Sequence, residues 1–149
     1  MKVETKAKLW TSCVLPVATY GGQTWSLTKN QLTKLKSMQN AMLRSILNIR
    51  LRDKVKIEKI KNRIQVPDIG YIIRKTKWKY AGHLAREQTW KWRYIATFGV
   101  PYDHKRQRGR PALRWRDEFR QWKGNWTKLA RDRDKWRVLT EAYARKWAG

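Results

Sequence analysis

The density of positive charge is the feature that most constrains what this chain can fold into. Lysine and arginine total 36 of 149 residues against 11 aspartates and glutamates, which gives a formal net charge of +25. Basic residues outnumber acidic ones in every third of the sequence, so there is no neutral body with a basic tail. Self-repulsion at this density opposes compaction, and a bound polyanion relieves it.

Hydrophobic residues nevertheless make up 41% of the chain, and there are ten tryptophans. Disordered polycations combine high charge with low hydrophobicity, so this chain is expected to fold. Its length suits one domain, or one domain with a small appendage. The single cysteine, Cys13, excludes an internal disulfide and suits a reducing compartment. There is no signal peptide and no apolar run of membrane-spanning length, so we expect an intracellular protein, nuclear or cytoplasmic.

Apolar residues recur at helical spacing along most of the sequence. An opening helix is interrupted at Pro16, and the next is capped by Thr28 and Gln31 and ends near Asn48. Asp53 is expected to cap a third helix, which must end before Pro67, and Asp68 a fourth over about 68–86.

The small residues near the end of that fourth helix, Ala81, Gly82 and Ala85, leave room for a close approach, which we expect from a second helix, with a nucleic acid strand as the alternative. Trp92 to Phe98 is a candidate short strand, and residues 103–109 are polar and basic. Pro111 suits the start of a helix that ends at Gly124, and Asn125 is expected to cap the last helix.

The fold class that follows is all-α, an irregular array of about five to six helices with a C-terminal helical hairpin after a basic loop. The expected division is a helical domain over 1–102, and the basic loop plus hairpin over 103–149. A hairpin of that size is too small to bury a sufficient core, so it must pack on the first part or on a partner.

Catalytic and metal-binding groups are sparse in the sequence. Two-metal phosphoryl transfer needs clustered carboxylates, but Asp117 and Glu118 point in different directions on a helix. One cysteine and two histidines cannot supply four zinc ligands, so no metal or cofactor is expected. His83 lies in an apolar stripe and Cys13 on an apolar helical face, and packing roles are expected for both. We therefore expect no catalytic residue, although an active enzyme with an unrecognised site remains an alternative.

Cations interleaved with aromatic rings are the stronger signal. Cations bind the phosphates of a nucleic acid, and aromatic rings stack on its bases. The segment Arg108-Gly109-Arg110-Pro111 is similar to an AT-hook, whose arginines enter a narrow minor groove. The alternative is a solvated loop that leads into a helix. Tryptophans at helical spacing, such as Trp136, are expected in the core, whereas Trp78, Trp90 and Trp92 are candidates for base stacking. The expected nucleic-acid-binding residues are Arg74, Lys75, Lys77, Trp78, Lys79, Arg86, Lys105, Arg106, Arg108, Arg110 and Arg114.

An ordered set of short motifs carries a resemblance to a known family. They are Cys13-Val14-Leu15-Pro16-Val17, Tyr20-Gly21, Thr24-Trp25, Arg52-Asp53, Gly82-His83 with Arg86, Arg108-Gly109-Arg110-Pro111 with Arg114-Trp115 and Asp117, and Asp132-Arg133 with Trp136. In this order they resemble the C-terminal region of reverse transcriptases from non-LTR retrotransposons, especially the insect endonuclease-reverse transcriptases.

The resemblance implies a region that follows the polymerase palm and comprises the helical thumb, here within 1–102, and the nucleic-acid-binding segment beyond it. The family's aromatic-x-Asp-Asp motif, its endonuclease residues and the zinc knuckle of some relatives are all missing here. The resemblance therefore implies a fragment whose parent activity is RNA-directed DNA synthesis.

The expected partners are nucleic acid (RNA, DNA or an RNA–DNA hybrid) and the missing palm of a parent protein, with the chain itself a monomer and no membrane involved. Alternatives are an inert element remnant, an AT-hook-like DNA-binding protein and a cationic protein of membrane surfaces.

Overall fold

The computed structural model describes residues 1–99, Gly109 and residues 114–146. Within these residues the regular structure is entirely helical, which confirms the all-α class. The longest helices are α3 (Lys29–Ile46), α5 (Ile69–Ala85) and α9 (Arg133–Lys146). Shorter helices are α1 (Val3–Leu9), α2 (Leu15–Ala18), α4 (Ile57–Ile64), α6 (Trp92–Phe98), α7 (Asp117–Trp122) and α8 (Trp126–Leu129).

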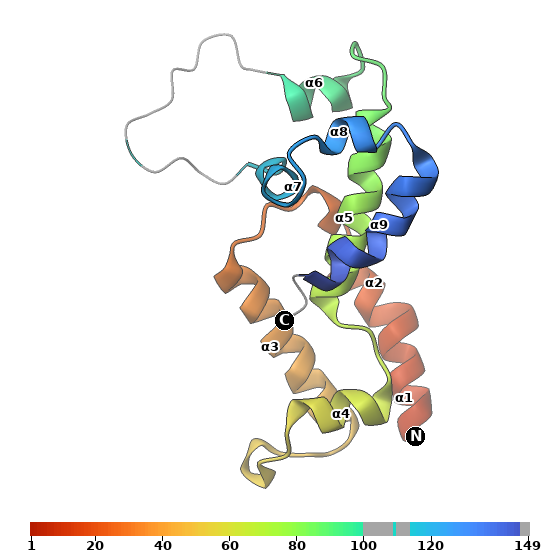
Figure 1. The fold of residues 1–149 in the computed structure, drawn as a ribbon. Coiled ribbons are helices and arrows are strands. Elements are labelled where there is room, and N and C mark those ends of the chain that lie inside the picture. The colour runs from red at the N-terminus through yellow and green to blue at the C-terminus, as the bar shows by residue number, and fades with distance from the viewer. Residues whose placement is uncertain (100–108, 110–113, 147–149) are drawn as a thin grey trace.

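Helix α5 is the central element of the fold. It contacts α3, α6, α8, α9 and the 3-10 turn Gly22–Thr24, so segments from both ends of the chain pack along it. Figure 1 shows α5 running lengthwise, with α1 to α4 around its N-terminal half and α6 to α9 around its C-terminal half. The chain is thus built around one helix that serves two sets of neighbours.

Two clusters of buried side chains follow from this arrangement. The N-terminal cluster comprises Trp10, Leu15, Leu43, Ile60, Ile64, Ile69 and Ile73. The aromatic cluster comprises Trp78, Ala81, Phe119, Trp126, Ala130, Trp136 and Tyr143. Because α5 supplies residues to both, it joins them into one folded body. The division at residue 103 stays a prediction, and the second cluster shows that the C-terminal helices pack on α5 as their small size requires.

Local sequence signals explain several helix ends. Thr28 and Gln31 form the expected capping box, in which Thr28 Oγ1 accepts a hydrogen bond from the Gln31 amide. Asp68 Oδ1 accepts from the amides of Gly70 and Tyr71 and caps α5 as expected. At Pro16 the opening helix is not broken but passes through a π-helical turn, Trp10–Val14. A wider turn accommodates the ring and the missing amide of proline.

Two predicted caps are wrong. Asp53 accepts from the Arg50 amide and closes a 3-10 turn, Leu51–Asp53, while α4 begins after Lys56 without a side-chain cap. The last helix is capped not by Asn125 but by Asp132, whose Oδ1 accepts from the amides of Asp134 and Lys135. Asp53 is thus used within a short turn that precedes α4, and the short helix α8 lies between Asn125 and the last helix; the sequence pattern distinguished neither.

Three further expectations are also corrected. Trp92–Phe98 is helix α6 rather than a strand. Cys13 and His83 are both exposed, so neither packs in the core. Cys13 lies in the π-helical turn. Such a turn contains more residues than an α-helical turn, so Cys13 is rotated away from the face that regular helical spacing predicts. His83 lies at the surface of α5, where it lines the hollow between α5 and α9.

Candidate nucleic-acid interface

A chain of three adjoining hollows, here called the basic groove, runs along the C-terminal half of α5. The first, of about 260 Å³, lies between α5 and α9 and is lined by Lys79, Arg86 and Arg133 among others. The second, of about 400 Å³, shares Arg86 and Arg133 with it and extends to Arg93. The third, of about 620 Å³, shares Arg93 and reaches Arg114. Each hollow therefore shares part of its wall with the next.

The lining of the basic groove is positively charged along its whole length. Its cations are Lys79, Arg86, Arg93, Arg114, Arg116, Arg133 and Arg137. Within the described part of the chain, Glu87 is the only acidic lining residue. Its carboxylate is bound by Lys91 at 2.8 Å and Arg93 at 3.0 Å, and these contacts lower the pKa of Glu87, chiefly through the hydrogen bond from Lys91. Glu87 thus neutralises little of the groove.

Most of these cations have no counterion among the residues that the structure describes. Across residues 1–99 and 114–146, no carboxylate lies within ion-pair distance of Lys79, Arg86, Arg114, Arg116 or Arg133. Uncompensated cations around a concave surface focus a positive potential toward solvent. The groove is therefore suited to an anion.

Arg86 occupies the junction of the first two hollows. Its guanidinium donates a hydrogen bond to the Ala130 carbonyl at the end of α8, which holds the side chain against the protein. Burial lowers the pKa of Arg86, and the positive charge of Arg133 lowers it further, although an arginine stays protonated at any physiological pH. Two neighbouring guanidinium groups without an acid repel each other, and a phosphate between them would remove that repulsion.

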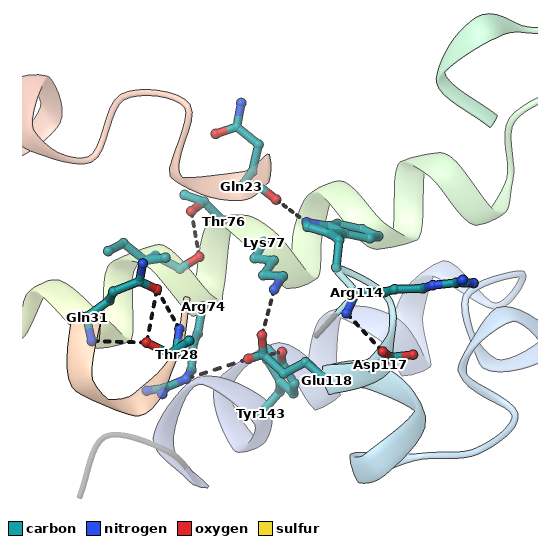
Figure 2. Close-up of polar contacts among 12 residues, drawn as sticks. Gln23, Thr28, Gln31, Arg74, Thr76, Lys77, Arg114, Asp117, Glu118 and Tyr143 are labelled. Atoms are coloured by element: carbon teal, nitrogen blue, oxygen red, sulfur yellow. Dashed lines mark hydrogen bonds and ion pairs between the residues drawn. The ribbon is translucent and has the colours of Figure 1, made fainter. Parts of the chain in front are cut away.

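Three of the predicted binding residues meet in this groove. Lys79 and Arg86 reach it from α5, and Arg114 from the segment that precedes α7. The Arg114 amide donates to Asp117 Oδ2 at 2.9 Å, which fixes the start of α7 and leaves the Arg114 side chain exposed (Figure 2). Lys105, Arg106, Arg108 and Arg110 lie outside the described residues, and their roles stay predictions.

Three other predicted residues are held in an internal network away from the groove. Lys77, with 3% of its side chain exposed, donates to Glu118 Oε2 at 2.6 Å, and Arg74 lies 3.8 Å from the other carboxylate oxygen (Figure 2). Tyr143 also donates to Glu118, at 2.6 Å. The burial of Tyr143 raises the pKa of its hydroxyl far above its usual value, so the hydroxyl remains a donor.

Lys75 likewise pairs with Glu141 at 2.5 Å, and this hydrogen bond is the main cause of its raised pKa. Nucleic-acid binding by Arg74, Lys75 and Lys77 stays a prediction, and in the folded chain each of them has a carboxylate partner. If a buried lysine such as Lys77 moved away from its carboxylate, the carboxylate would lose that counterion inside the protein, which is costly.

Trp78 is the clearest correction among the predicted residues. Its indole is fully buried, stacks on Trp136 with ring centroids 3.7 Å apart and packs against Tyr143 at 4.5 Å. No base can reach it. By contrast Trp90 and Trp92, the other two stacking candidates, are 71% and 83% exposed.

Sequence reasoning missed four cations of the groove, namely Arg93, Arg116, Arg133 and Arg137. Arg133 and Arg137 lie four residues apart and so share one face of α9, a signal that was available in the sequence. Arg93 and Arg116 enter the groove only because α6 and the start of α7 fold back toward α5, which no local pattern indicates.

The described residues include no group of three or more histidine, cysteine or acidic side chains placed to hold a metal ion. In the same residues, no helix combines the length and the hydropathy that crossing a membrane requires.

Comparison with known proteins points to a mobile element. The chain is 28% identical over 145 residues to a transposon-derived protein of Caenorhabditis elegans, and the match covers 88% of this chain. The chain spans about half, 52%, of the length of that relative. No protein-family profile and no solved structure matches the chain. The similarity indicates a transposon-related origin.

Proposed function

We propose that this chain is a nucleic-acid-binding module of a transposon-encoded protein, resembling the C-terminal part of a non-LTR retrotransposon reverse transcriptase. It holds the phosphate backbone in the basic groove and performs no catalysis of its own. The observation that carries the proposal is the continuous lining of Lys79, Arg86, Arg114, Arg116 and Arg133 without a carboxylate partner among the described residues.

The distribution of acidic residues supports this proposal. Glu118 and Glu141 form ion pairs with Arg74, Lys75 and Lys77, which lie on α5 outside the groove. These two carboxylates thus hold helices together, while Lys79, Arg86, Arg114, Arg116 and Arg133 of the groove have no carboxylate partner among the described residues. A nucleic acid in the groove would release its condensed counterions, which is the main source of sequence-independent affinity.

The transposon-related origin supports a setting in which the parent protein copies RNA into DNA. In that setting the ligand of the groove is the template–primer duplex or the element's own RNA, and the missing polymerase palm is a second partner. Nuclear or cytoplasmic residence suits either ligand. The AT-hook-like role of Arg108 and Arg110 remains part of the proposal, although both residues lie outside the described part of the chain.

Titration of the whole chain with labelled nucleic acid at several salt concentrations tests the proposal. If six to ten phosphates are bound, affinity falls by about 10³- to 10⁵-fold between about 50 and 200 mM salt. Competition by duplex DNA, RNA–DNA hybrid and folded RNA ranks the ligands. A binding curve that is flat across this salt range contradicts the proposal.

An inert element remnant is the second candidate, and one observation favours it. Apolar side chains on α1, the π-helical turn and α2 are exposed, among them Leu9 (45%), Val14 (39%) and Val17 (77%). Such a surface suits an interface with the palm of a parent protein. This candidate predicts that the isolated chain self-associates and binds nucleic acid no more tightly than an unfolded polycation of equal charge does.

A further inference from the structure

Two exposed tryptophans lie where α5 turns into α6. Trp90 is 71% exposed and Trp92, the first residue of α6, is 83% exposed. The other tryptophans that the structure describes are all buried or half-buried. They are Trp10, Trp25, Trp78, Trp115, Trp122, Trp126 and Trp136. Leaving two indoles in water forgoes the burial of large apolar surfaces, so this exposure sets them apart from the core residues.

The segment that carries these indoles is attached to the basic groove. Glu87, at the end of α5, binds Lys91 at 2.8 Å and Arg93 at 3.0 Å, and these two cations flank Trp92 in the sequence. Arg93 itself lines the second and third hollows of the groove. The Lys91 ammonium also lies 5.9 Å from the centroid of the Trp90 ring. The segment that carries the exposed rings is therefore anchored next to the groove, where the chain passes from α5 into α6 (Figure 1).

Flat aromatic rings beside a cationic groove are the arrangement that single-stranded nucleic acid requires. A base stacks on an indole whatever its identity, with a gain of about 1–3 kcal/mol per base. Inside a duplex each base is covered on both faces by its neighbours and only the terminal pairs show a face, whereas every unpaired base can offer one. The cations on both sides of Trp92 share one carboxylate, Glu87, and their remaining positive charge suits phosphates rather than an apolar protein surface.

We propose that Trp90 and Trp92 form a stacking platform for unpaired bases at the α6 end of the basic groove. The ligand class is then a strand with unpaired nucleotides next to its groove-bound backbone, either a single strand or a duplex with a single-stranded end. This inference rests on the proposed function, because the groove holds the backbone that delivers the bases.

Fluorescence anisotropy with three labelled ligands of equal phosphate number tests it: a single strand, a blunt duplex and a duplex with a single-stranded tail. In the double variant Trp90→Ala/Trp92→Ala, affinity for the single strand and the tailed duplex falls by about 5- to 150-fold per stacked base. Affinity for the blunt duplex is unchanged. Trp90→Phe/Trp92→Phe keeps the aromatic faces and recovers most of the affinity.

Leu51→Ala is the matched control, because Leu51 is an exposed apolar residue (79%) in the 3-10 turn before α4 and does not line the groove. It leaves all three affinities unchanged. If the alanine double variant binds every ligand as the wild type does, the stacking platform is wrong and the groove stands. If the wild type binds none of the three ligands in a salt-dependent way, the groove itself fails and the platform fails with it.

Discussion

Trp78 and Trp136 form a reciprocal pair at the centre of the aromatic cluster. Their rings are parallel to within 5°, with centroids 3.7 Å apart. The Trp78 indole donates to the Trp136 carbonyl at 3.2 Å, and the Trp136 indole donates to the Trp78 carbonyl at 3.1 Å. Each buried indole thus donates its one N–H group to a backbone carbonyl of the opposite helix. This pair fixes α9 against α5 and, with it, Arg133 and Arg137 against the groove.

The close approach of the two helices depends on Gly82. A Cβ at this position would lie 2.7 Å from Cδ1 of Trp136, whose ring is buried and cannot move aside. Gly82→Ala is therefore expected to destabilise the fold by about 1–3 kcal/mol through overpacking, although alanine is the better helix former. Urea unfolding followed by circular dichroism measures the change.

Gly124→Ala is the control for this substitution, because no atom lies within 4 Å of a Cβ built at that position. It should leave the unfolding midpoint almost unchanged. Equal stability of Gly82→Ala and the wild type would show that α9 does not lie against α5 as described.

Gln39 determines how α5 begins. Its side chain is fully buried, donates to the Pro67 carbonyl at 2.8 Å and accepts from the Ile69 amide at 2.9 Å. Gln39→Leu has a similar volume but leaves both backbone groups without this partner, so a loss of about 2–4 kcal/mol is expected. Thermal or urea unfolding measures it. The same change at the exposed Gln88 should be nearly neutral, and a neutral Gln39→Leu would contradict the buried hydrogen bonds.

Asp68 gives the fold a dependence on acid pH. Burial by itself would raise the pKa of this carboxyl, but hydrogen bonding and ion pairing with Lys61, at 2.8 Å, together with the Lys36 charge and the Tyr71 amide, bring it below its ordinary value of 3.8. A carboxyl with a depressed pKa in the folded state contributes stability above the unfolded-state pKa, and that contribution is lost as the pH falls through the folded-state value.

Unfolding of the wild type and of Asp68→Asn between about pH 6 and pH 2.5 tests this dependence. Asparagine keeps the cap of α5 but loses the ion pair with Lys61. The variant is expected to be the less stable protein at pH 6, and the difference should shrink as the pH falls below 3.8. A difference that stays constant over the whole range would exclude the ion pair as its cause.

The sequence allowed the helical class and the better-marked helices to be predicted, because periodic apolar residues and side-chain caps act locally. Thr28 with Gln31, and Asp68, are correct for this reason. Asp53 failed because its carboxylate closes the turn Leu51–Asp53 instead of capping α4, and Asn125 failed because it precedes the short helix α8, to which its side chain makes no capping hydrogen bond.

The candidate site was predictable only in part. Lys79, Arg86 and Arg114 face the groove, but a count of cations cannot say which of them have a carboxylate opposite. Lys77 and Trp78 looked like binding residues because they follow one another in a basic, aromatic stretch of α5. The partners that remove them from the surface, Glu118 and Trp136, lie 41 and 58 residues further along the chain.

The central claim is that the basic groove, rather than total charge, binds nucleic acid, and a matched pair of double variants tests it most directly. Lys79→Gln/Arg133→Gln removes two exposed groove cations, whereas Lys59→Gln/Arg63→Gln removes one exposed lysine and one exposed arginine from α4, outside the groove. The measurement is the dependence of the binding constant on salt concentration for the wild type and both variants.

The groove variant is expected to bind more weakly at every salt concentration and to lower the slope of log K against log salt by about 1.8 for duplex DNA, or about 1.4 for a single strand. The α4 variant should keep the wild-type slope. Equal losses of affinity and slope in the two variants would contradict the account, because net charge alone would then explain the binding.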